Sequence, residues 1–278
     1  MLTTRRLAVW GDPIEHSRSP RLHTAAYRVL GFDWTYDRRR VDEAGFPAAL
    51  DSLGPSWLGL SLTMPLKGVA YRHAVRRDRH AQLTGAVNTY LLGPHGPQGF
   101  NTDVGGIVGA LTETGHLGVT SARIVGTGAT ATSALVALHE LGVRDVDVAA
   151  RRPDAVHRLA VLGEQLGVRV TASPLAPGGH RAVPLTIATL PGDADLPEAV
   201  TDGLATAGGT LFDVVYGTWP TVLGAAWERA GLPAASGLGM LLHQAIRQIR
   251  VFANGDPDAP LPAEADVLAV MRREVMGD

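Results

Sequence analysis

The stretch ARIVGTGATATSALVALHELGVRDVDVAARR (122–152) decides the fold of this chain. It opens on a short apolar run, 123–125, which breaks into a turn containing Gly126 and Gly128. Small and apolar residues at helical spacing follow, and then a second β-branched run over 143–148. The order strand, glycine turn, helix, strand is typical of the first half of a dinucleotide-binding βαβ unit.

Three small residues have separate roles in such a turn. Gly126 allows the chain to turn tightly, and Gly128 lets backbone amides approach a pyrophosphate at the positive end of the helix. Ala131 takes the place of the third small residue, which permits close packing of the helix on the strand. For this motif alone, a tight strand-to-helix turn in another kind of α/β protein is the alternative interpretation.

The end of the second strand favours NADP over NAD. Where NAD-binding proteins place an acidic residue for the ribose hydroxyls, this chain has Ala150, followed by Arg151 and Arg152. Guanidinium groups without a neighbouring carboxylate suit a 2′-phosphate. The alternative is a solvated pair of surface arginines. Asp147 lies a few residues too early to take the acidic role, so we expect it to point elsewhere.

Composition narrows the class of protein. The chain has 278 residues, of which 45% are hydrophobic and 19% charged, as in a globular protein of one or two domains with a sizeable core. The net charge of −2 argues against a nucleic-acid partner, and the lack of cysteine excludes disulfides and thiolate chemistry. No signal peptide or long apolar run is present. We therefore expect a cytoplasmic protein with no membrane partner.

The rest of the chain predicts strands that alternate with helices. Expected strands cover 7–10, 34–41, 57–62, 86–92, 98–101, 168–172, 185–189 and 210–215, with a hairpin between the fourth and fifth. Expected helices follow Pro20 and Lys67 and cover 46–53, 104–114, 153–166, 221–230, 239–253 and 262–276. This alternation predicts an α/β protein with two mostly parallel sheets. Ser19 is expected to cap the helix at Pro20.

Polar residues just past the strand ends are candidates for a ligand site. Ser17 and Ser19 could present hydroxyls and amides to a carboxylate, with helix capping as the alternative. Lys67 stands in the first turn of a helix, where its charge opposes the dipole, and this favours a functional role. Asn88 and Asp103 could equally serve turns and caps. No histidine or carboxylate cluster has metal-ligand spacing, so no metal is expected.

Seven segments of the chain together resemble one family. They are GDPIEHSRSP (11–20), SLTMPLK (61–67), GAVNT (85–89), NTD (101–103), VGTGATA (125–131), DVVYGTWPT (213–221) and SGLGMLLHQA (236–245). In order and spacing they resemble the shikimate dehydrogenase family over nearly the whole chain, which is a far more specific signal than the glycine turn alone.

The resemblance implies both an architecture and an activity. It implies a substrate-binding domain over 1–103, completed by C-terminal helices over 238–278, and a Rossmann NADP-binding domain over 104–237. The implied activity is the reversible NADPH-dependent reduction of 3-dehydroshikimate to shikimate, in the pathway to chorismate and the aromatic amino acids. The implied partners are therefore this small-molecule pair and NADP, and a homodimer is one option for the oligomeric state.

The resemblance also assigns roles to particular residues. Lys67 and Asp103 match the family's catalytic pair. Residues that match its substrate contacts are Ser17, Ser19, Thr63, Asn88, Tyr216 and Gln244. Residues that match its cofactor contacts are Gly126, Gly128, Ala129, Ala131, Arg151, Arg152, Thr189, Val214, Gly237 and Met240.

The chain departs from the usual pattern of the family at three places. Ser61 stands where the family usually has Asn, which puts one substrate contact in question. Ala150, Arg151 and Arg152 replace the usual Asn-Arg-Thr, so NADP selectivity is expected to rest on the two arginines together. The segment around Thr189 matches the family's cofactor-facing loop only loosely.

Two further functions compete with this interpretation. A quinate/shikimate or aminoshikimate dehydrogenase belongs to the same class, but the two serines and the arginine pair favour shikimate and NADP. A nucleotide-binding sensor without catalysis belongs to another class. Loss of Lys67 or Asp103 would have supported it, and the chain retains both.

Overall fold

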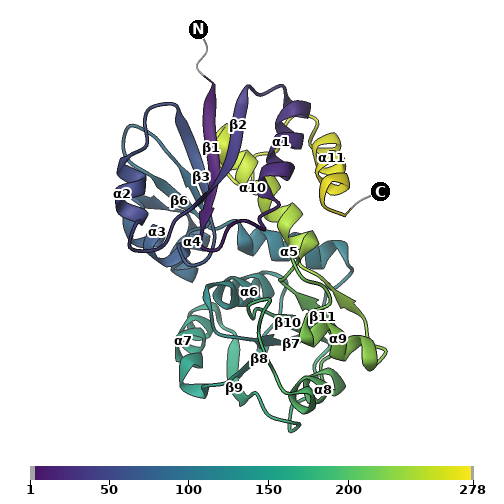
Figure 1. Ribbon diagram of the computed structural model, residues 1–278. Helices are drawn as coiled ribbons and strands as arrows, with labels where there is room; N and C mark the ends of the chain where they lie inside the picture. The colour runs from purple at the N-terminus through teal and green to yellow at the C-terminus, as the bar shows by residue number, and fades with distance from the viewer. Residues whose placement is uncertain (1–3, 277–278) are drawn as a thin grey trace. The chain divides into compact units, whose positions relative to one another are not determined.

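The computed structural model describes residues 4–276 and divides the chain into two compact units (Figure 1). The first unit comprises the residues up to 106 and those from 242 onward, and the second comprises residues 107–241. The chain leaves the first unit within α5 (Asp103–Glu113) and returns to it within α10 (Leu238–Asn254). The second unit is thus inserted into the sequence of the first.

The first unit is built on a mixed sheet of six strands in the order β2-β1-β3-β5-β6-β4. The strands are β1 (Arg5–Gly11), β2 (Trp34–Arg40), β3 (Trp57–Leu62), β4 (Arg76–Arg77), β5 (Thr89–Leu91) and β6 (Gln98–Phe100). Strand β1 pairs in parallel with β2 and β3, whereas β5 is antiparallel to both β3 and β6. The hairpin predicted between β5 and β6 is confirmed, and it makes this sheet mixed rather than mostly parallel.

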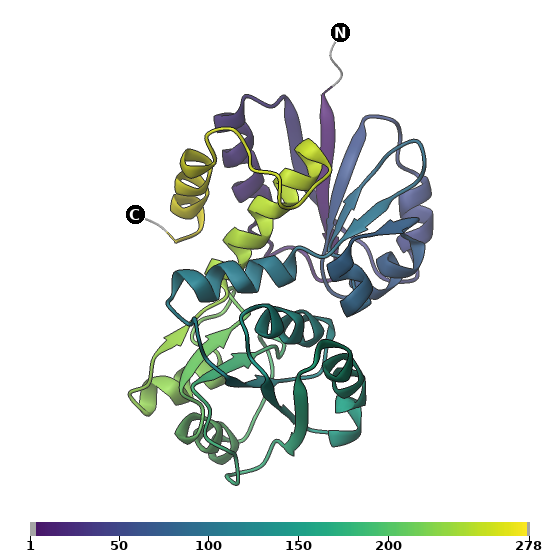
Figure 2. The same ribbon diagram turned by 180° about the vertical axis from the view of Figure 1, so that it is seen from behind.

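Helices cover both faces of this sheet (Figures 1 and 2). One group is α1 (Ser19–Leu30), α10 and α11 (Glu264–Met276), and the other is α2 (Phe46–Asp51), α3 (Lys67–His73) and α4 (Arg79–Thr84). Successive residues of β3 face opposite sides of the sheet, so they contact different groups of helices. Gly59 lies against Phe252 of α10, while Leu60 and Leu62 belong to a core cluster with Phe46 of α2.

The second unit has a parallel sheet in the order β9-β8-β7-β10-β11-β12. Its strands are β7 (Ser121–Val125), β8 (Asp145–Ala150), β9 (Arg169–Pro174), β10 (Leu185–Ala188), β11 (Thr210–Asp213) and β12 (Ala234–Ala235). Helices α6 (Ala129–Glu140) and α7 (His157–Leu166) pack together, as do α8 (Glu198–Thr206) and α9 (Val222–Arg229). This is the Rossmann strand order, and its topological switch point lies between β7 and β10.

The structure corrects the predicted start of the first helix. Helix α1 begins at Ser19 itself, and Arg18 occupies the cap position without a side-chain cap bond. The Ser19 amide instead donates to Ser17 Oγ, 3.3 Å away. The helix starts one residue early because Arg18 already has helical backbone angles. The helix predicted over 153–166 is split into a 3-10 turn (Pro153–Val156) and α7.

An ion pair lies inside the second sheet. Arg123 of β7 is fully buried, and its Nε donates to Asp147 Oδ2 of β8 at 2.7 Å. The two residues are direct partners in the strand register. The prediction that Asp147 points away from a nucleotide role is consistent with this pairing. Within residues 4–276, no helix is long and apolar enough to cross a membrane.

Candidate active site

A lysine and an aspartate form a short ion pair in the first unit. Lys67 is the first residue of α3, and Asp103 is the first residue of α5. Lys67 Nζ lies 2.6 Å from Asp103 Oδ2, and their side chains are only 14% and 6% exposed. With so little water around them, the two charges hold each other in a defined geometry.

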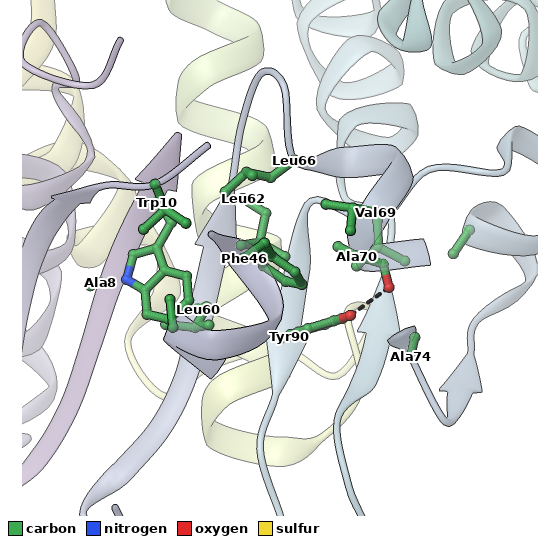
Figure 3. Packing of buried hydrophobic residues seen from close by; sticks show 14 residues of the cluster. Ala8, Trp10, Phe46, Leu60, Leu62, Leu66, Val69, Ala70, Ala74 and Tyr90 are labelled. Atoms are coloured by element: carbon green, nitrogen blue, oxygen red, sulfur yellow. Dashed lines mark hydrogen bonds between the residues drawn. The ribbon is translucent and has the colours of Figure 1, made fainter. Parts of the chain in front are cut away.

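The core beneath α3 fixes the position of Lys67 (Figure 3). Leu66, Val69 and Ala70 are buried in the cluster that contains Phe46 of α2. The Tyr90 hydroxyl of β5 donates to the Ala70 carbonyl, which ties the helix to the sheet. One side of α3 is therefore anchored in the core. Its first residue, Lys67, follows the C-terminal end of β3 by five residues.

Asn88 holds the other oxygen of the Asp103 carboxylate. Its Nδ2 donates to Asp103 Oδ1 at 2.8 Å and to Thr102 Oγ1 at 3.0 Å. Its Oδ1 accepts from the Thr102 amide at 2.9 Å and from the Thr89 hydroxyl at 2.8 Å. Asn88 is buried, so these bonds fix its orientation. The carboxylate is thus held by Lys67 on one oxygen and Asn88 on the other.

Two further residues shape this turn, and neither is among the predicted site residues. Asn101 Oδ1 accepts the Asp103 amide at 3.0 Å, while its Nδ2 donates to Thr84 Oγ1 at 2.9 Å. Asp78 Oδ1 accepts the amides of Ala81 and Asn101 at 2.7 and 3.2 Å. Burial raises the pKa of the Asp78 carboxyl. Asn101 lies in the NTD segment, but Thr84 and Asp78 lie 17 and 23 residues away from it, so only the fold shows these bonds.

The other predicted substrate residues of the first unit lie at or near element ends, except Gln244, which lies within α10. Ser17 and Thr63 are half-buried, while Ser19 and Gln244 are buried. Ser17 precedes α1 directly, and Thr63 follows β3. That Ser17, Ser19, Thr63 and Gln244 contact substrate stays a prediction. Tyr216, the remaining predicted substrate residue, is half-buried in the second unit after β11.

In the second unit, the glycine turn lies at the switch point of the sheet. Gly126 has φ +115°, and a Cβ there would lie 2.6 Å from Thr189 Oγ1. Thr189 follows β10, and its hydroxyl donates to the Val125 carbonyl at 3.0 Å. Gly128 is the cap residue of α6, and a Cβ there would meet nothing within 4 Å. Ala129 opens the helix and Ala131 is buried, so the helix N-terminus is open to a phosphate group.

A second close backbone approach involves Gly237. A Cβ on Gly237 would lie 2.1 Å from the Val214 carbonyl oxygen, and its amide donates to the Val215 carbonyl at 2.9 Å. Asp213 accepts from the Thr221 hydroxyl and the Val215 amide, and burial raises the pKa of its carboxyl. Val214 is half-buried and Met240 is buried. Any residue other than glycine at 237 would displace this loop.

Arg151 and Arg152 follow β8, and both are exposed. Among the described residues, neither side chain makes a hydrogen bond or an ion pair. Ala150 before them is buried at the end of the strand. Two unpaired guanidinium groups at this edge fit the 2′-phosphate of NADP, and a glycine turn that leads into an open helix N-terminus fits its pyrophosphate.

A buried lysine–carboxylate pair and a Rossmann sheet with this glycine turn define the class of protein, a dinucleotide-dependent oxidoreductase. Over residues 4–276, no group of three His, Asp or Glu side chains could hold a metal ion. The chain belongs to the shikimate dehydrogenase family, as comparisons with known proteins show.

The family model for the shikimate dehydrogenase substrate binding domain matches residues 9–90. An NADP(+) shikimate dehydrogenase of Methanothermobacter thermautotrophicus is 31% identical over 95% of this chain and 96% of its own length. One from Methylobacterium radiotolerans is 35% identical over 88% of this chain and 90% of its own length.

Solved structures agree with this assignment. A shikimate dehydrogenase of Mycobacterium tuberculosis has 41% sequence identity and a TM-score of 0.83, over 95% of this chain and 99% of that one. A shikimate 5-dehydrogenase of Thermus thermophilus, in complex with NADP(H) and shikimate, has 29% identity and a TM-score of 0.77, over 98% of this chain and 100% of that one.

Proposed function

We propose that this chain catalyses the reversible NADP-dependent reduction of 3-dehydroshikimate to shikimate, in the pathway to chorismate and the aromatic amino acids. The observation that carries the proposal is the pair formed by Lys67 and Asp103 at 2.6 Å. It lies in the unit that contains the match to the family's substrate-binding domain. Relatives named NADP(+) shikimate dehydrogenase, similar over nearly the whole chain, support the same reaction.

The protein's part in this chemistry is to hold the substrate and move one proton. The bound dinucleotide supplies a hydride to the carbonyl carbon in the reduction direction. Lys67 stabilises the negative charge that develops on the carbonyl oxygen and exchanges a proton with it. Asp103 holds the ammonium group, and Asn88 holds Asp103, so the catalytic groups need little rearrangement during the reaction.

The remaining predicted residues divide between the two ligands. Ser17 and Ser19 would receive the substrate carboxylate, and Thr63, Asn88, Tyr216 and Gln244 its hydroxyls and ring. The glycine turn would hold the pyrophosphate of NADP. Thr189, Val214, Gly237 and Met240 would line the nicotinamide end, and Arg151 and Arg152 would hold the 2′-phosphate.

One assay tests the activity and its nearest alternative together. NADP⁺ reduction is followed with shikimate and with quinate as separate substrates, and each is repeated with NAD⁺. We expect turnover with shikimate and NADP⁺ to exceed the other three combinations. Greater turnover with quinate would make the chain a quinate/shikimate dehydrogenase, and no turnover with any combination would favour the nucleotide-binding sensor. A homodimer stays a prediction, which sedimentation equilibrium tests.

A further inference from the structure

Gln248 is a buried polar residue outside the predicted substrate and cofactor contacts. It lies on α10, one helical turn after Gln244, and is 3% exposed. Its Oε1 accepts a hydrogen bond from Ser61 Oγ at 2.6 Å and lies 3.3 Å from His23 Nε2. Its Nε2 donates to the Asn88 carbonyl at 3.5 Å. One amide therefore joins α10 to α1, β3 and the residue that holds Asp103.

The surrounding hydrogen bonds leave this amide one orientation. The Asn88 carbonyl can only accept, so the NH₂ group of Gln248 must face it. The Tyr36 hydroxyl donates to Ser61 Oγ at 2.6 Å, which leaves the Ser61 proton for Gln248 Oε1. The Ser61 hydroxyl is thus engaged inside the unit.

His23 completes the arrangement as a neutral donor. Burial lowers its pKa to about 3, so the ring carries a single proton near neutral pH. Because Gln248 Oε1 can only accept, that proton lies on Nε2, and Nδ1 is left to accept from the Tyr27 hydroxyl 3.0 Å away. The ring also stacks on Tyr36 at 3.9 Å between centroids. Every polar group that faces Gln248 thus has a defined partner.

We infer that Gln248 is a positioning residue, which holds the Asn88 peptide so that the Asn88 side chain stays directed at Asp103. The Asn88 carbonyl has a second donor, the Leu62 amide at 2.7 Å. Gln248 therefore provides the side-chain hydrogen bond to the Asn88 carbonyl. It does so from α10, more than 150 residues further along the chain. The inference rests on the proposed function, since it concerns the binding of substrate at the same site.

The test compares Gln248→Met with Tyr36→Phe. Methionine keeps the size of Gln248 and removes its hydrogen bonds, whereas phenylalanine removes a hydroxyl of the same network that donates to Ser61 rather than to Asn88. For Gln248→Met we expect the KM for shikimate to rise about five- to tenfold, the loss of one hydrogen bond, while the KM for NADP⁺ stays within about twofold. Tyr36→Phe should leave both constants near those of wild type.

A second variant guards against a folding failure. Gln248→Glu keeps the shape of the side chain, and its carboxylate still accepts from Ser61 and His23 but cannot donate to Asn88. It should therefore show the same rise in the KM for shikimate. The inference is wrong if the KM for shikimate is unchanged in both Gln248 variants, if the KM for NADP⁺ rises equally, or if Tyr36→Phe has the same effect.

A spectroscopic measurement separates this inference from the proposed function. In ¹⁵N NMR spectra, Gln248→Met should shift the side-chain amide signal of Asn88, and Tyr36→Phe should not. This readout needs no turnover. A wild-type protein inactive with shikimate would overturn the proposed function, and an unmoved Asn88 signal would overturn the positioning role by itself.

Discussion

Lys67 is a charged residue at the N-terminus of a helix, where its charge opposes the dipole. The structure shows what offsets that cost, namely the Asp103 carboxylate at 2.6 Å. The sequence identified both residues because each lies in a short, ordered motif. It gave no role to Gln248 or Asp78, because a hydrogen bond such as that from Ser61 to Gln248 joins residues 187 positions apart. No local pattern carries such a pairing.

Replacement of Lys67 by alanine should abolish most of the turnover but weaken the binding of shikimate only slightly. The ammonium acts chiefly on charge that develops in the transition state, so we expect kcat to fall by about 10²- to 10⁴-fold. The KM for shikimate should change by no more than a few-fold. Steady-state kinetics of shikimate oxidation give both values, and retained NADP⁺ binding is the control for folding. A variant with nearly full kcat would remove Lys67 from the mechanism.

Arg151 and Arg152 should decide the choice of cofactor. Loss of a charged contact to the 2′-phosphate costs about 1.5–3 kcal/mol, or roughly 10- to 100-fold in affinity. We therefore expect Ala150→Asp combined with Arg151→Ala to move the preference from NADP⁺ towards NAD⁺ by about that factor. Arg152→Ala should have a smaller effect. The measurement is the ratio of kcat/KM for the two cofactors, and a double variant that keeps its NADP⁺ preference would show that the phosphate is bound elsewhere.

Among elements, those with an apolar or periodic pattern were predictable, whereas β4 and α4 were not. The strand predicted over 57–62 is β3 to the residue, and the helix predicted over 239–253 is α10 within one residue. Strand β4 has two arginines, and α4 has one turn and a half of mostly polar residues, so neither gives a periodic signal. Both exist because Asp78 caps α4 and β4 pairs with β6.

The ion pair between β7 and β8 gives a test at this scale. Asp147→Ala leaves the Arg123 guanidinium fully buried without its carboxylate, which should lower the free energy of unfolding of the second unit by about 3–5 kcal/mol. The matched control is Asp145→Ala on the same strand, whose partner Arg169 has a 71% exposed side chain. An exposed pair contributes about 1 kcal/mol or less. Urea titrations give both values, and equal losses would contradict the argument.

At the scale of the whole molecule, the sequence predicted an α/β chain with two sheets, and the structure confirms this. Parallel strands alternating with helices leave few possible orders, and the Rossmann order of the second unit is one of those that the connection rules allow. The sheet of the first unit is mixed because β5 is antiparallel to both of its neighbours, β3 and β6. What the motifs could not give is the precise residue at which the chain changes unit, because α5 and α10 continue across both changes.

The division of the predicted residues between units leads to a test with ligands. Shikimate alone should slow hydrogen exchange chiefly in the first unit, around Lys67, Asn88 and Asp103. NADP⁺ alone should slow it chiefly in the second unit, around the turn at Gly126 and the end of β8. Exchange followed by mass spectrometry resolves the two sets of peptides. Protection of the second unit by shikimate alone, with none in the first, would contradict the assignment of the substrate groups.

The insertion of one unit into the other also sets an order of synthesis. A ribosome completes residues 107–241 before it adds α11, against which α1 packs, and before it adds the part of α10 that carries Gln248. The unit begun first is therefore finished last, and the cofactor-binding unit is the earlier one able to fold. A nascent chain arrested once residue 241 has emerged should already yield a protease-resistant fragment from the second unit. Helix α1 then still lacks its packing partner α11.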